Sequence, residues 1–154
     1  MLYLVDDAAD YRFLVQQVFK MFLPQYSLRV FADGLELIQY IEEKSTALPV
    51  ALTESDLTSP DEIHLDVDHT DVARPNLIVL DVDMPKLNGL QTLERLKQNP
   101  YWRSVPVVLM SNRIDPEFKE IAYQLGAASF LTKPTDLLML RDVLGQLCRE
   151  WVVG

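Results

Sequence analysis

Short apolar runs that end abruptly in polar residues recur along this chain, and they constrain its fold more than any other feature. Four of them cover residues 2–5, 77–80, 107–110 and 130–131, and residues 27–32 form a weaker fifth. The runs are rich in β-branched residues and do not alternate with polar ones, which is typical of strands buried on both faces. The sequence therefore predicts a sheet that is covered on both sides.

Helix signals lie between these runs. Asp115, Pro116 and Glu117 supply a capping carboxylate, a proline at the first helical position and an acid in the first turn, and Gly126 supplies a stop. Asp136 is expected to cap a last helix in the same way. The apolar faces predicted for the five helices are Leu14, Val18 and Phe22; Leu37, Ile38 and Ile41; Leu90, Leu93 and Leu96; Phe118, Ile121, Ala122 and Leu125; and Leu140, Leu144, Leu147 and Trp151.

The order of elements is strand then helix, five times over. This order indicates an α/β fold with a parallel sheet, helices on both faces and right-handed crossovers. Ligand sites of such sheets lie beyond the carboxyl ends of the strands. Polar residues stand at four of those ends, so we expect one rim of the sheet to bring together Asp6, Asp7, Asp81, Ser111 and Lys133.

The chemistry of this set fits phosphoryl transfer to an aspartate. Three carboxylates repel one another unless a cation neutralises them, and a hard divalent ion, best Mg²⁺ (or Mn²⁺), prefers such oxygen ligands. A lysine and a serine hydroxyl suit phosphate oxygens. A carboxylate can itself be the nucleophile and form an acyl phosphate, so Asp81 is the predicted phosphoacceptor.

Over residues 2–150 the chain resembles the receiver domain of bacterial response regulators. The resemblance rests on Leu-Val-Asp-Asp at 4–7, Leu-Ile-Val-Leu-Asp-Val-Asp-Met-Pro at 77–85, Asn-Gly at 88–89, Val-Pro-Val-Val-Leu-Met-Ser at 105–111, Gly-Ala at 126–127 and Phe-Leu-Thr-Lys-Pro at 130–134. It implies a flavodoxin-like, doubly wound sheet of five parallel strands in the order 2-1-3-4-5 with five helices. Residues 1–154 are expected to form a single receiver domain.

The resemblance assigns roles to the acidic residues. It implies that Asp81 accepts the phosphoryl group, that Asp7 binds the metal directly, and that Asp6 binds it through water. Asp83 would offer its backbone carbonyl to the same ion. The implied cofactor is Mg²⁺ or Mn²⁺.

The resemblance also assigns roles around the phosphoryl group. Ser111 and Lys133 would contact it, and Phe130 matches an aromatic residue that changes rotamer on activation. Pro134 follows the lysine, and the bond before it is often cis in the family, while Gly89 matches a structural glycine.

Asp83 and Arg113 occupy positions that vary in the family. Asp83 adds negative charge at the mouth of the site, and Arg113 lies two residues after Ser111. We hypothesise that Arg113 pairs with Asp83 or reaches the phosphoryl oxygens, and so sets the lifetime of the phosphorylated form.

Residues 45–74 are longer than the usual link between the second helix and the third strand, and they carry seven carboxylates against one base. An acidic surface loop is the first interpretation. The alternatives are a partner-docking edge strand around residues 63–67 and a transition-metal site at His64 and His69. The insertion and Arg-Pro-Asn at 74–76 weakly resemble receivers that work with phytochrome-type kinases.

The favoured function is a signalling relay. A histidine kinase or phosphotransfer protein would donate the phosphoryl group, and the protein would hydrolyse it slowly rather than act as an enzyme. With no output domain expected after residue 154, the signal would leave by docking to a downstream protein through the fourth helix, fifth strand and fifth helix. Residues 151–153 could also form a dimer face.

Two rival functions remain open. Asp-Val-Asp at 81–83 also fits a phosphatase resembling the haloacid dehalogenase group, although Met84 and Pro85 do not suit its motif. A pseudo-receiver that binds a partner without phosphate is the other, and the complete acidic set argues against it.

Composition excludes some classes. The formal net charge of −9 argues against nucleic-acid binding, which normally leaves a basic surface. No apolar run is long enough to span a bilayer, so neither a membrane partner nor a signal peptide is expected, and a cytoplasmic protein is the simplest interpretation. Cys148 has no partner in the chain and falls at an apolar helical position.

Overall fold

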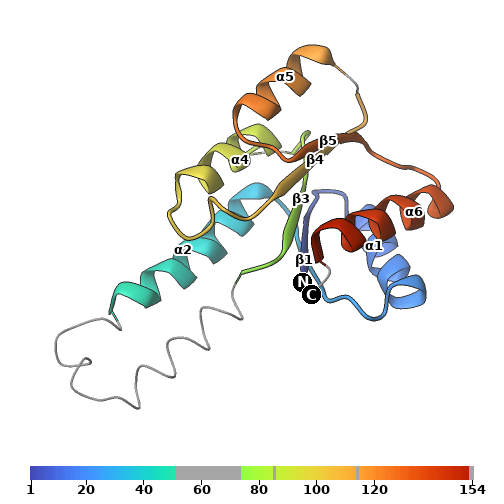
Figure 1. Cartoon of the computed structure of the whole chain (residues 1–154), viewed down its shortest axis with the longest axis horizontal. Helices are drawn as coiled ribbons and strands as arrows, with labels where there is room; N and C mark the ends of the chain where they lie inside the picture. Colours follow the sequence, from blue (N-terminus) through green and yellow to red (C-terminus); the bar gives the residue numbers. More distant parts are fainter. Residues whose placement is uncertain (51–73, 85, 114, 153–154) are drawn as a thin grey trace.

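The computed structural model describes residues 1–50, 74–84, 86–113 and 115–152. Five parallel strands form one sheet in the order β2-β1-β3-β4-β5 (Figure 1). Their bounds are β1 (Leu2–Val5), β2 (Leu28–Phe31), β3 (Leu77–Asp81), β4 (Val107–Ser111) and β5 (Ser129–Thr132). This order confirms the predicted flavodoxin-like fold, and every predicted strand is present.

Helices cover both faces of the sheet. They are α1 (Ala9–Phe22), α2 (Gly34–Val50), α4 (Gly89–Gln98), α5 (Pro116–Gln124) and α6 (Leu137–Leu147), and the π-helical turn η2 (Cys148–Val152) continues the last of them. Figure 1 shows α1 and α6 together on one side of the sheet, and α2 and α4 on the other. None of the described helices has the length and apolar character needed to cross a membrane.

Successive residues of β1 serve two different cores. Leu2 and Leu4 pack with α1 and α6, whereas Tyr3 and Val5 pack with α2 and α4. Side chains of a strand alternate between the faces of its sheet, so a strand covered on both sides needs an apolar residue at every position. This explains why the runs in the sequence do not alternate.

Some predicted helix faces were wrong in detail. Phe118 and Ile121 of α5 are exposed, and Ala122 is the buried residue of that helix. Helix α5 contacts β5 at the edge of the sheet. The small side chain of Ala122 lets the helix approach the strand closely, and the larger Phe118 and Ile121 side chains are left in solvent. Phe22 and Trp151, at the ends of their helical segments, are also exposed.

The predicted start of the inserted segment was also too early. Helix α2 continues through Val50, although the loop was expected from residue 45. Residues 44–48 contain neither glycine nor proline, so no helix-breaking residue stands there. Residues 51–73, where an edge strand and a metal site at His64 and His69 were suggested, lie outside the described residues.

The predicted helix caps are confirmed. The Asp115 carboxylate accepts a hydrogen bond from the Glu117 amide at 3.0 Å, and Asp136 accepts one from the Leu138 amide at 2.9 Å. A further capping box, which the sequence analysis missed, joins Asn88 to Gln91 at the start of α4. These caps fix where the helices leave the carboxyl edge of the sheet.

Gly89 brings the start of α4 onto the backbone that carries Asp81. Its amide donates to the carbonyl of Val82 at 3.1 Å. A Cβ atom at this position would lie 2.5 Å from the Asp81 carbonyl oxygen and 2.9 Å from the Val82 Cα atom. Both are backbone atoms, so a change of side-chain rotamer cannot relieve the clash.

We predict that Gly89→Ala destabilises the protein by about 1–3 kcal/mol, since overpacking must shift the backbone. The measurement is the free energy of unfolding in urea. Gly145→Ala is the matched control, because its nearest neighbours are the ends of the Arg149 and Leu23 side chains at 3.2 and 3.8 Å. Equal stabilities for the two variants would contradict the close approach at Gly89.

Candidate functional site

Four strand ends place polar side chains on one rim of the sheet. Asp6 follows β1, and its amide donates to the Phe31 carbonyl oxygen of β2 at 3.2 Å. Asp81 ends β3 and Ser111 ends β4. Lys133 follows β5, and its amide donates to the Ser111 carbonyl oxygen at 2.8 Å. The ladder hydrogen bonds therefore hold these residues in register, although the sequence separates them widely.

Three carboxylates meet on this rim. One oxygen each from Asp6, Asp7 and Asp81 can be chosen so that all lie within 4.8 Å of one another. The Asp6 and Asp81 residues are only 1% and 5% exposed, whereas Asp7 is exposed. The cluster is thus closed toward the core and open on the side of Asp7.

Lys133 neutralises part of this charge. Its Nζ atom lies 2.6 Å from Asp6 Oδ2 and 3.6 Å from Asp81 Oδ2, and its side chain is 9% exposed. Removing one partner of such a buried pair leaves an uncompensated charge, which is strongly unfavourable. Three carboxylates and one ammonium still leave the cluster negative at neutral pH.

The pKa of Asp81 is raised to about 6. Burial is the largest cause, and the neighbouring Asp6 carboxylate is the next. Lys133 and the Asp83 amide, which donates to Asp81 Oδ1 at 3.2 Å, act in the opposite direction. Burial and the Asp6 carboxylate therefore make ionisation of the Asp81 carboxyl costly in the absence of a cation.

The carboxylate set fits a hard divalent cation. Mg²⁺ and Mn²⁺ prefer oxygen ligands, and the cluster offers one carboxylate oxygen from each of three residues together with an excess of negative charge. The Asp6 carboxylate already pairs with Lys133, which suits the expectation that Asp6 binds the metal through water. Metal binding by the backbone carbonyl oxygen of Asp83 stays a prediction.

Ser111 is buried at the same rim. Its hydroxyl oxygen accepts a hydrogen bond from the Arg113 amide at 3.1 Å. The hydroxyl keeps its own hydrogen, which it can donate to an anionic oxygen beside Asp81.

Arg113 and Asp83 contact each other as one of the two hypothesised arrangements required. The Arg113 Nη2 atom lies 3.3 Å from Asp83 Oδ1, and the two side chains are 73% and 47% exposed. An exposed pair of this kind contributes little to stability. Its position near Asp81 and Ser111 makes it a candidate for controlling access to the site.

Phe130 is buried in the core that α2 and α4 share with the sheet. Pro134 is buried too, and the bond before it is trans, unlike the cis bond that the resemblance suggested. Trans is the lower-energy form of the bond before a proline.

Sequence reasoning missed two residues of α1 beside the cluster. Arg12 donates from Nη1 to the Asp6 carbonyl oxygen at 2.7 Å. The ring of Tyr11 lies against Lys133, with Nζ 4.1 Å from the ring centroid. Both follow Asp7 within about one and a half helical turns, so spacing from the acidic pair was the available signal.

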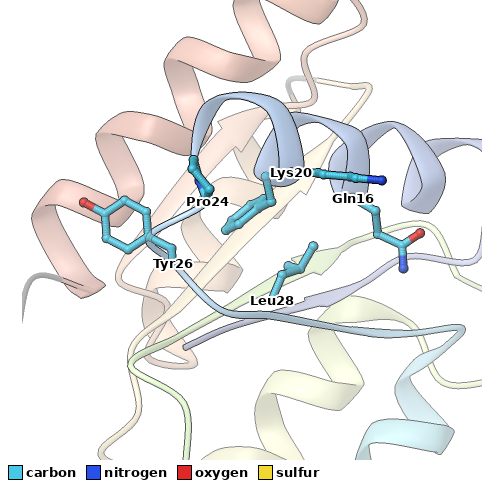
Figure 2. A pocket seen from close by; sticks show the side chains of 6 residues that line it. Gln16, Lys20, Pro24, Tyr26 and Leu28 are labelled. Carbon is cyan, nitrogen blue, oxygen red and sulfur yellow. The ribbon is translucent and has the colours of Figure 1, made fainter.

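A pocket on another part of the molecule does not belong to this site. It lies between α1 and β2 and is lined by Gln16, Phe19, Lys20, Pro24, Tyr26 and Leu28 (Figure 2). None of the rim residues contributes to it. The chemistry therefore concentrates at the strand ends and not in this pocket.

We predict that the metal-free protein loses stability as pH rises from about 4 to about 6. Folding raises the pKa of Asp81 from its ordinary value of 3.8 to about 6, so the folded state holds this proton more tightly than the unfolded chain does. The loss attributable to Asp81 is about 1–2 kcal/mol. The measurement is urea unfolding with a chelator across this range.

Asp81→Asn removes the titrating group and should flatten that profile. Mg²⁺ should restore stability of the unsubstituted protein at neutral pH, because it binds the folded state. A profile that is unchanged in Asp81→Asn would contradict the assignment.

Comparison with known proteins agrees with the fold. Residues 53–144 match the family model described as response regulator receiver domain. The response regulator Rcp1 of Synechocystis sp. is 28% identical over 147 residues, which cover 96% of this chain and 84% of Rcp1. The solved Mn²⁺-bound form of Rcp1 superposes with a TM-score of 0.68 at 26% identity, over 96% of this chain and 90% of that one.

Two further proteins also match, one over most of its length and one over a small part of it. The phosphorylated cyanobacterial phytochrome response regulator RcpA has a TM-score of 0.72 at 22% identity, over 98% of this chain and 92% of that one. A probable cyclic di-GMP phosphodiesterase of Vibrio cholerae is 29% identical over 67 residues, which span 44% of this chain but only 15% of that protein. Its activity therefore does not transfer with the match. With its strand order, its acidic rim and the family model in agreement, the chain belongs to the response regulator receiver domain family.

Proposed function

We propose that residues 1–154 form one receiver unit in which Asp81 accepts a phosphoryl group from a histidine kinase or a phosphotransfer protein. The observation that carries this proposal is the meeting of the Asp6, Asp7 and Asp81 oxygens within 4.8 Å, with Lys133 beside two of them. Mg²⁺ or Mn²⁺ is the proposed cofactor, and the cytoplasm is the proposed location.

The proposed chemistry is an in-line displacement at phosphorus. An ionised Asp81 oxygen forms the new P–O bond while the P–N bond to the donor imidazole breaks, and the imidazole leaves with the electron pair of that bond. The bound metal supplies charge neutralisation for the carboxylates and the phosphoryl oxygens. Lys133 neutralises charge at Asp81, and the Ser111 hydroxyl donates to a phosphoryl oxygen.

The proposed output follows from the position of Ser111 on β4. A hydroxyl drawn toward the phosphoryl group loosens the packing beside β5, where Phe130 is buried. The face formed by α5, β5 and α6, which is the predicted fourth-helix, fifth-strand and fifth-helix surface, would then dock an unidentified downstream protein. Hydrolysis of the acyl phosphate resets the site slowly, and a homodimer is a second proposed output.

The first prediction from this proposal is labelling at Asp81. With Mg²⁺ and acetyl phosphate, the protein should gain the mass of one phosphoryl group, and Asp81→Asn should gain none, because an amide oxygen is not an adequate nucleophile. Intact-mass spectrometry measures both.

Asp83→Asn is the matched control, since it makes the same change at an exposed carboxylate two residues away and leaves the backbone carbonyl in place. It should still gain one phosphoryl group, because the acceptor carboxylate of Asp81 is intact. Failure of the folded, Mg²⁺-loaded protein to label would count against the proposal. Sustained turnover of a phosphomonoester would favour the phosphatase interpretation instead.

A second prediction concerns Arg113. Its pair with Asp83 is exposed, so Arg113→Ala should change the lifetime of the phosphorylated form by roughly two- to fivefold, the range expected for an exposed ion pair. The measurement is the decay of phosphorylated protein after the donor is removed.

Arg141→Ala is the control for this measurement, because it breaks another exposed arginine–aspartate pair, to Asp142, on α6. It should leave the lifetime unchanged. A decay rate in Arg113→Ala within about twofold of the unsubstituted protein would overturn the role given to the pair.

A further inference from the structure

Tyr11 lies beside the acidic site without a role in the function proposed above. It is the third residue of α1 and is partly buried against the core that α1 and α6 form with the sheet. The face of its ring is turned to Lys133, whose Nζ atom is 4.1 Å from the ring centroid.

The ammonium of Lys133 therefore contacts three groups. Asp6 Oδ2 lies at 2.6 Å, Asp81 Oδ2 at 3.6 Å, and the Tyr11 ring takes a further side of the cation. A lysine ends in a compact charge on a flexible four-carbon stem, so the stem alone does not fix where the charge sits. An aromatic face attracts a cation, most strongly where water is excluded, and only 9% of this side chain is exposed.

A simpler explanation is that Tyr11 only covers the apolar core. The direction of the ring opposes it, because the ring face meets the Lys133 ammonium, with Nζ 4.1 Å from the centroid. The Tyr11 hydroxyl oxygen is buried and has no hydrogen-bond partner among the residues that the structure describes, so the ring and not the hydroxyl makes the contact with the site. The pKa of the hydroxyl is raised, first by burial and then by the carboxylates of Asp6 and Asp81, in keeping with a side chain close to both. Tyr11 therefore faces the acidic site as well as the core.

We propose that Tyr11 is a positioning residue for Lys133, whose ring fixes the ammonium between Asp6 and Asp81, where it meets the phosphoryl group. The last part rests on the proposed function of Asp81. Without the ring, the close contact to Asp6 would dominate, and the ammonium would spend less time near Asp81. The hydroxyl is not needed for this role, so phenylalanine should replace tyrosine and an aliphatic residue should not.

The first test does not depend on phosphorylation. In the metal-free protein, the ring current of Tyr11 should move the Cε proton signals of Lys133 upfield of those of other lysines. The Lys133 signal is assigned by its loss in Lys133→Arg. The displacement should persist in Tyr11→Phe and disappear in Tyr11→Leu and Tyr11→Met. A Lys133 signal that is the same in all four proteins would overturn the proposal.

The second test measures labelling by acetyl phosphate with Mg²⁺. Tyr11→Leu and Tyr11→Met should lower the rate constant at saturating donor by at least about fivefold, while Tyr11→Phe stays within about twofold. The donor concentration at half-maximal rate should be unchanged, because the ring does not touch the donor. Urea unfolding identifies which aliphatic variant is folded, and methionine is included because its flexible chain fills the space of the ring with least strain.

The outcomes separate the two proposals. If the aliphatic variants label at the unsubstituted rate, or if Tyr11→Phe loses as much as they do, the positioning role is wrong. If the unsubstituted protein does not label at all, the proposed function fails, and the Lys133 signal still decides whether the ring holds the ammonium.

Discussion

The mutual repulsion of three carboxylates at the end of one sheet is the constraint on which the rest of this structure depends. Asp6 and Asp81 are buried side by side, and burial and Asp6 together raise the pKa of Asp81 to about 6. Lys133 compensates part of the charge from 2.6 and 3.6 Å. A site that stays negative after this compensation fits a divalent cation with oxygen ligands.

The fold supplies the rigidity that this arrangement needs. Asp6, Asp81, Ser111 and Lys133 stand at ends of neighbouring strands, and backbone hydrogen bonds of the parallel ladder fix their register. Helix α4 begins on the backbone of Asp81 itself, where Gly89 leaves no room for a Cβ atom. Asp83 and Arg113, by contrast, lie in the loops beyond the strands and are exposed. The ends of the strands thus hold the buried charges of the site.

The strands and the rim residues could be predicted because unbroken apolar runs with polar ends have few other uses in an α/β sheet. The order of the strands followed from the resemblance to receiver domains. The exposed Phe118 and Ile121 could not be predicted, since periodicity gives the apolar side of a helix but not how much sheet lies beneath it. The extension of α2 to Val50 was missed because sequence signals locate helix ends poorly. Tyr11 escaped notice because spacing places it near the acidic pair but does not give the path of the Lys133 side chain that its ring contacts.

The most direct test of the central claim is to identify the residue that carries the phosphoryl group. The protein is first labelled with acetyl phosphate and Mg²⁺. An aspartyl phosphate is an acyl phosphate, and borohydride reduces it to homoserine. Peptide mass spectrometry then shows which aspartate has become homoserine. The account predicts homoserine at position 81 and unchanged aspartate at positions 6, 7 and 83. Homoserine at one of those other positions, or no conversion in protein that has gained a phosphoryl group, would contradict it.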